Sequence, residues 1–177
     1  WELAILKEMV FQPVFSRGDT MYILSEWPPL AEVWRYVTPI LLHFSFVHIL
    51  FKSLMLLEVG RRIEAKQGTG RILLLVLVCA LISNAGQFYA SPGTIFGGLS
   101  GVVFGLIGYA WLFDKLRGQA ELALPNGLFV SALIWLVLCF SPLPEWAGLG
   151  KVANAAHIWG LLGGLLIAAL SARPVKS

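Results

Sequence analysis

The most constraining feature of the sequence is a run of 42 residues without a charged side chain, between Arg71 and Asp114. A helix needs about 20 apolar residues to cross the hydrocarbon core of a bilayer once, so this run has to fold back on itself. Pro92 and three glycines in the stretch SPGTIFGG, residues 91–98, predict the break. Overall, 58% of the residues are hydrophobic and only 13% are charged, which places the chain in a membrane.

Three further segments are long enough for one crossing each. Leu122 to Pro144 and Val152 to Ala172 carry no charge, and another segment ends at Arg61 and, counted back, begins near Leu41. We therefore predict an all-α, polytopic membrane helix bundle with five recognisable transmembrane helices, whose core runs from about residue 41 to 172. Residues 1–33 carry too many charges for a span and are predicted to form an N-terminal segment and outer loop.

Lysine and arginine gather in three segments that the predicted spans place on one side of the membrane: Arg61, Arg62, Lys66 and Arg71; Lys115 and Arg117; Arg173 and Lys176. Basic loops stay on the cytoplasmic side, so the segments that contain Trp34, Pro92 and Glu145 are predicted to face outward. Membrane topology accounts for the net charge of +3, and no nucleic-acid partner is expected.

The stretch GGLSGVVFG, residues 97–105, surrounds Ser100 with glycines. As a helix, the segment from Gly98 to Asp114 spans roughly 24 Å at about 1.5 Å per residue, less than the ~30 Å of the hydrocarbon core. The helix is therefore predicted to start below the outer surface, after a loop that dips into the membrane. Backbone at that depth is buried in protein or lines a water-filled cavity. We expect Ser100 at the floor of such a cavity and at a helix N-terminus.

Two series of small residues recur at helical intervals. The first consists of Gly101, Gly105 and Gly108, and the second consists of Ala153, His157, Gly160 and Gly164. Small residues let membrane helices approach closely, which explains such series as packing alone. If the two series face each other, however, His157 reaches Ser100 as a base reaches its nucleophile. Burying a polar pair between apolar helices costs free energy, so its presence there favours a functional role.

Several segments together resemble one known family. They are MYIL at 21–24, EVWRY at 32–36, HFSFVHILF at 43–51, IEAKQGTGR at 63–71, FGGLSGVVFGLIGY at 96–109 and NAAHIWGLLGG at 154–164. In this order and spacing they resemble the rhomboid intramembrane serine proteases, most closely the bacterial GlpG group, from about Met21 to Ala172. The resemblance implies a single rhomboid-like membrane domain, residues 1–177, in which the first of the usual six helices is missing or truncated.

The resemblance also implies a catalytic dyad without a carboxylate. Ser100 is the expected nucleophile and His157 the general base, with Phe104 stacked on the imidazole. His48 and the main-chain N–H of Ser100 are expected to serve the oxyanion hole, next to the glycine loop that contains Gly98.

By the same resemblance, the expected partners are the lipid bilayer and transmembrane protein substrates, cut near their outer ends. Entry is expected through a lateral gate around Leu128 to Phe140. The expected location is the bacterial inner membrane, as a multi-pass protein whose active site opens to the outer side. Neither a cofactor nor a metal is expected, because His43 and His48 are five residues apart and do not share a helix face. The oligomeric state stays open.

Four other polar residues are assigned supporting roles from their positions alone. His43 is expected to make a structural hydrogen bond in the outer loop. Asn84 and Gln87, near the end of a predicted span, are expected to satisfy backbone groups of that loop. Asn154 is expected to orient main chain near His157.

Lys52 departs from the family, which has an asparagine at this position, one helical turn after His48. Three interpretations stay open: an ammonium that holds the oxyanion, an amine that burial keeps neutral and that competes with His157 as base, or a cation that disfavours the imidazolium and weakens or abolishes activity. The alternative function is a catalytically weak or inactive rhomboid-like protein that binds transmembrane helices. Retention of both Ser100 and His157 favours the protease.

Overall fold

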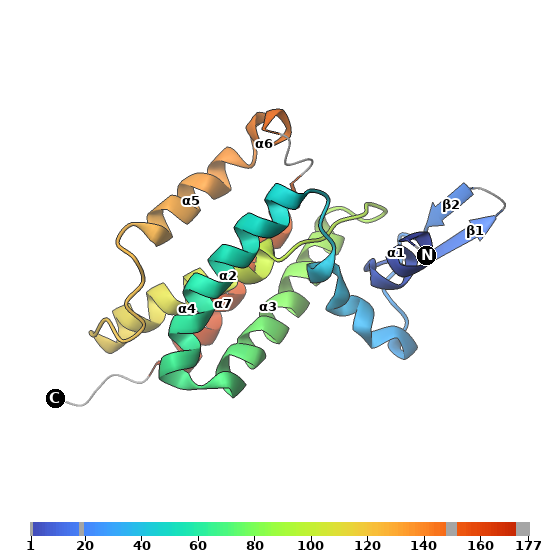
Figure 1. Ribbon diagram of the computed structural model, residues 1–177. Coiled ribbons are helices and arrows are strands. Elements are labelled where there is room, and N and C mark those ends of the chain that lie inside the picture. Colours follow the sequence, from blue (N-terminus) through green and yellow to red (C-terminus); the bar gives the residue numbers. More distant parts are fainter. Residues whose placement is uncertain (1, 18–19, 148–151, 173–177) are drawn as a thin grey trace.

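The computed structural model describes residues 2–17, 20–147 and 152–172, which are mostly helical. In chain order the elements are α1 (Glu2–Met9), β1 (Val14–Arg17), β2 (Thr20–Ile23), the 3₁₀ helices η1 (Leu30–Tyr36) and η2 (Thr38–Leu41), α2 (Phe46–Gln67), α3 (Thr69–Ala90), α4 (Ser100–Arg117), α5 (Leu128–Leu138), α6 (Leu143–Trp146) and α7 (Asn154–Ser171). In Figure 1, α2, α3, α4 and α7 form one bundle, α5 runs along its edge, and the hairpin β1–β2 stands on the opposite side.

Helix α4 is the centre of this bundle, and every residue from Ser100 to Ala110 is buried. Helices α2, α3, α5 and α7 all contact it, and α7 does so most extensively. A helix that is surrounded in this way is apolar on every side rather than along one stripe. The sequence GVVFGLIGYA, which follows Ser100, has this character.

The two series of small residues face each other, as the sequence analysis anticipated. A Cβ atom on Gly160 would lie 2.0 Å from the carbonyl oxygen of Gly101, and one on Gly164 would lie 1.8 Å from that of Gly105. Neither distance leaves room for a side chain. The backbones of α4 and α7 therefore touch, and this contact fixes the first turn of α4 beside the first turns of α7.

The N-terminal segment supports the loop that precedes α4. The buried Gln12 side chain accepts a hydrogen bond from the N–H of Gly93 at 2.8 Å and donates one to the carbonyl of Thr94 at 3.1 Å. Phe11 packs with Phe88 and Phe96 in a separate hydrophobic cluster. Phe11 and Gln12 of the N-terminal segment thus contact the loop directly, although no charge-free run marks this segment.

Helix α2 begins later than predicted. Thr38–Leu41 forms the separate 3₁₀ helix η2, and α2 starts at Phe46, where the Ser45 hydroxyl accepts a hydrogen bond from the His48 N–H at 3.2 Å. A serine N-cap marks a helix start more strongly than apolar composition does, which explains the shift from Leu41.

Two of the described helices, α3 and α7, are long and apolar enough to cross a membrane. A third span is obtained if η1, η2 and α2 are counted together across a bend of 98°. Helix α4 carries three charged residues in its last turns, and α5 has only 11 residues within the charge-free run that was predicted to cross. Pro125 and Gly127 before α5, and Pro142 after it, shorten that helix. The count of five spans stays a prediction.

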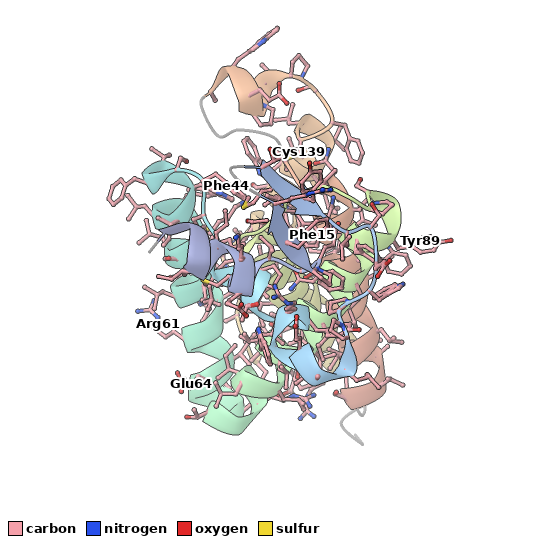
Figure 2. The ribbon with its side chains drawn as sticks, turned by 90° about the vertical axis from the view of Figure 1, so that its right-hand side faces the viewer. Phe15, Phe44, Arg61, Glu64, Tyr89 and Cys139 are labelled. Atoms are coloured by element: carbon pink, nitrogen blue, oxygen red, sulfur yellow. The ribbon has the colours of Figure 1, made fainter. Side chains whose placement is uncertain are left out.

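Basic residues gather at one end of the bundle. Arg62 donates to the carbonyl of Ala123 at 2.6 Å and pairs with Glu58, and Asp114 accepts from the N–H groups of Leu122 and Ala123. In Figure 2, Arg61 and Glu64 lie toward the lower end of the molecule, and Phe44 and Cys139 lie toward the upper end. Arg173 and Lys176, which also entered the orientation argument, lie outside the described residues.

Replacing Gly164 with alanine should destabilise the bundle by about 1–3 kcal/mol, the usual cost of overpacking a core. Gly70→Ala is the matched control, because a Cβ atom there meets nothing within 4 Å. Its effect should stay below about 1 kcal/mol. Thermal unfolding in detergent, followed by circular dichroism, measures both variants. Equal midpoints would contradict the close contact between α4 and α7.

Candidate functional site

The glycines of the loop before α4 let this loop lie directly against the 3₁₀ helix η2. Gly98 has a φ of +116°, a value that favours glycine, and its N–H donates to the carbonyl of Pro39 at 2.9 Å. A Cβ atom on Gly97 would lie 2.8 Å from the same carbonyl oxygen. Helix α3 ends at Ala90 and α4 begins at Ser100, so the predicted break in the long charge-free run is confirmed. Ser100 starts the helix, as expected.

Ser100 opens on a cavity of about 250 Å³. We call it the main cavity because it contains the predicted site residues, although two other cavities, of about 540 and 400 Å³, are larger. Its lining residues are Val47, His48, Phe51, Lys52, Gly97, Ser100, Trp135, Cys139, Val152, Ala153 and His157. Ser100 is 4% exposed and His157 is 2% exposed. The structure therefore brings four of the predicted site residues, Ser100, His157, His48 and Lys52, to one largely apolar space.

The imidazole of His157 is held by packing. The ring of Phe104 stacks on it with centroids 4.7 Å apart and planes inclined by 29°, the arrangement that the resemblance implied. Among the described residues, the buried Nδ1 atom of His157 has no hydrogen-bond partner. Hydrogen bonds between catalytic groups are often long before substrate binds. The stack, rather than a polar partner, sets the orientation of the ring.

His48 enters the cavity from the first turn of α2, next to the glycine loop. A Cβ atom on Gly98 would lie 3.0 Å from Cε1 of His48, so a larger residue at this position would push the imidazole away by a few tenths of an ångström. The Nδ1 atom of His48 is buried and has no partner in the described part of the chain.

His43 does not lie on α2, and the argument from helical spacing is therefore wrong for this residue. It sits in the preceding segment, and its ring meets that of His48 edge to face at 5.3 Å. His43 Nδ1 lies 3.1 Å from the carbonyl oxygen of Leu41, and its Nε2 accepts from the N–H of Leu99 at 3.4 Å. The expected structural hydrogen bond is confirmed, and it anchors the residue before Ser100. Within the described residues, no three His, Cys, Asp or Glu side chains are grouped so that they can hold a metal.

Lys52 lies in α2 with only 6% of its surface exposed. It lines the main cavity and also a second, smaller cavity of about 100 Å³ between α2, α4 and α5. Its ammonium nitrogen lies 5.5 Å from the ring centroid of Phe51, within the range of a cation–π contact. No ion pair to Lys52 exists in residues 2–17, 20–147 or 152–172.

Two amides fix the start of α7. Gln87 from α3 accepts a hydrogen bond from the Ala156 N–H at 3.0 Å, and Asn154 donates to the carbonyl of Cys139 at 2.9 Å. The first bond satisfies one of the N–H groups that have no acceptor within their own helix. Gln87 therefore serves α7 rather than the outer loop, which corrects the prediction. Asn154 is the first residue of α7, in the same turn as His157, and it holds the chain that follows α5.

Asn84 makes the second outer-loop contact that was predicted, besides that of His43. Asn84 donates to the carbonyl of Tyr36 at 2.9 Å, so its predicted role is confirmed. Trp135 and Cys139 lie within the predicted gate, Leu128 to Phe140, but were not expected in the cavity wall, and Gln12 was not expected to bind the loop before α4. Gln12 precedes a proline in a charged segment, and only its fold partners distinguish it from a surface residue.

The family model described as Rhomboid domain matches residues 30–174. Over 173 residues, the chain is 39% identical to Rhomboid protease GlpG of Salmonella choleraesuis (strain SC-B67) and 38% identical to that of Salmonella paratyphi A (strain ATCC 9150 / SARB42). These matches cover 95% of this chain and 61% of either relative, so the chain spans about three-fifths of their length.

A match over most of the chain assigns the class: this is an integral membrane protein of the rhomboid family. Its similarity to the GlpG proteins makes it a GlpG-like rhomboid. The apolar helices α3 and α7 agree with that class.

Gln87→Ala should lower the free energy of unfolding by about 1–3 kcal/mol, the cost of leaving a buried donor without an acceptor. Gln119→Ala is the control, because Gln119 is exposed. Resistance to heat-induced aggregation in detergent, read by size-exclusion chromatography, compares the two. If both variants behave like the parent, the bond to Ala156 does not stabilise α7.

Proposed function

We propose that this chain is an intramembrane serine protease that cleaves transmembrane helices of other membrane proteins. The main cavity carries the proposal, because Ser100 and His157 line it from two helices whose backbones touch. A hydroxyl beside an imidazole is the arrangement of a nucleophile and its base. The similarity to proteins named Rhomboid protease supports the same function.

In the proposed reaction, His157 takes the hydroxyl proton of Ser100 while Oγ attacks the carbonyl carbon of the scissile peptide bond. The tetrahedral intermediate collapses, the C–N bond breaks, and the imidazolium gives its proton to the leaving amine. Water then attacks the acyl-enzyme and passes its proton to His157. The carboxylic acid product leaves, and the Ser100 hydroxyl is restored.

We assign stabilisation of the oxyanion to His48 and to the N–H of Ser100, a first-turn donor without an acceptor inside its helix. Gly98 supports this role, because a side chain there would crowd the His48 ring where it lies against the loop. Lys52 lines the same cavity and replaces the family asparagine as a further donor. Removing one such donor usually costs a factor of about 10² to 10³ in rate.

We place the site in a bundle of five spans whose basic end faces the cytoplasm of a bacterium and whose main cavity opens to the outer side. In α5 only Ala132 is buried, whereas Val130, Ile134 and Val137 are exposed. A helix with so few buried residues separates from its neighbours at low cost. This supports a lateral gate for substrate along Leu128 to Phe140.

The second candidate function is that of an inactive protein that binds transmembrane helices, and Lys52 is the observation that favours it. A cation beside His48 and His157 opposes the imidazolium that the reaction requires.

Labelling with a fluorescent fluorophosphonate tests the proposal. The parent should be labelled, Ser100→Ala should not, and His157→Ala should be labelled at least ~100-fold more slowly, the usual contribution of a general base. Ser83→Ala is the matched control, because Ser83 is also buried but donates to the carbonyl of Ala80. It should be labelled like the parent.

The same experiment separates the two functions. Labelling of Lys52→Asn without labelling of the parent would favour the inactive, helix-binding protein. Equal labelling of the parent and Ser100→Ala would contradict a serine protease at this site.

Phe104→Leu should slow labelling about tenfold or more, because the His157 ring loses the stack that orients it. Phe104→Tyr keeps an aromatic ring and should retain the parent rate within about threefold. Rates within a factor of two for all three proteins would mean that the stack does not orient the base.

A further inference from the structure

Lys52 is a buried lysine whose charge is not neutralised by the part of the chain that the structure describes. The ion pairs of the described residues all involve arginine: Arg35, Arg61, Arg62 and Arg117. Glu58, on the same helix, is already paired with two of them. Glu145 lines a neighbouring cavity with Cys139 and Asn154, not either cavity that Lys52 lines. Placing an ionisable residue inside a membrane helix costs free energy, and such residues usually pair with a group of opposite charge.

The smaller cavity adjoins the main cavity, which Ser100 lines. It shares Phe51, Lys52 and Trp135 with the main cavity, and its remaining walls are mostly apolar. Its volume is about 100 Å³. Since one water takes about 30 Å³ of the liquid, there is room for a short side chain. A peptide whose carbonyl carbon lies at Ser100 can therefore extend a side chain toward Lys52.

We propose that Lys52 forms an anion-binding subsite that selects a short acidic side chain, that of aspartate, at the residue whose carbonyl Ser100 attacks. The inference rests on the proposed protease function. Folding has already buried the lysine, so a substrate carboxylate meets a cation that, among the described residues, has the ring of Phe51 beside it but no counterion. A substrate asparagine at this position has nearly the same shape as aspartate but leaves the Lys52 ammonium without a counterion. A substrate lysine would place a second cation beside Lys52.

The test uses the purified chain in detergent and four transmembrane peptides that differ only at the scissile residue, which is Ala, Asn, Asp or Lys. The measured quantity is the ratio of kcat/KM for the Asp peptide to that for the Asn peptide. A buried charge pair should raise this ratio to about tenfold or more in the parent. Because the ratio is taken within one protein, a general loss of activity cancels.

Two variants of Lys52 sharpen the result. Lys52→Met keeps the length of the side chain without its charge, and its ratio should fall to about one or below. Lys52→Arg keeps the charge and should preserve a preference for aspartate. If neither variant folds, the ratio of kcat/KM for the Asp peptide to that for the Asn peptide in the parent still tests the subsite.

The experiment gives different results if the subsite proposal is wrong and if the protease proposal is wrong. Cleavage of the Ala peptide that depends on Ser100, with an Asp to Asn ratio of one or below in the parent, overturns the subsite alone. A preference for aspartate that survives in Lys52→Met also overturns it. No cleavage of any peptide and no labelling of Ser100 by fluorophosphonate overturns both proposals.

Discussion

The contact between the backbones of α4 and α7 is the constraint on which the candidate site depends. The backbone at Gly101 and Gly105 leaves no room for a side chain at Gly160 or Gly164, so the two helices are in direct backbone contact. In a membrane, apolar burial does not drive helices together, and close packing of this kind takes its place. The same contact sets the start of α4 against the first turns of α7, where His157 lies.

Buried hydrogen bonds, together with the glycine contacts, hold the irregular segments around the main cavity in place. Within the bilayer no water satisfies a free backbone group, so irregular segments have to find partners in the protein. Gln12 and His43 bind the loop before Ser100, and Gln87 binds the first turn of α7. These three polar side chains hold an irregular loop and a helix start at fixed positions on either side of the main cavity.

The pair of Ser100 and His157 could be predicted from the sequence, because polar residues are rare in long apolar segments, whereas the roles expected of His48 and Phe104 came from the resemblance to the rhomboid family. The break before Ser100 and the facing small-residue series follow from local pattern. The late start of α2 and the short α5 do not, since caps and prolines override the apolar runs that suggested longer spans. The smaller cavity beside Lys52 also escaped prediction, because its walls come from three helices that are far apart in the chain.

The central claim is that one helix contact makes Ser100 a nucleophile with His157 as its base. A crystal structure of the chain in lipid, after reaction with diisopropyl fluorophosphate, tests it most directly. The account predicts phosphorus bonded to Oγ of Ser100, with the His157 ring beside it and still stacked on Phe104. Phosphorus on another residue, or helices α4 and α7 separated so that Gly105 and Gly164 no longer touch, would contradict it.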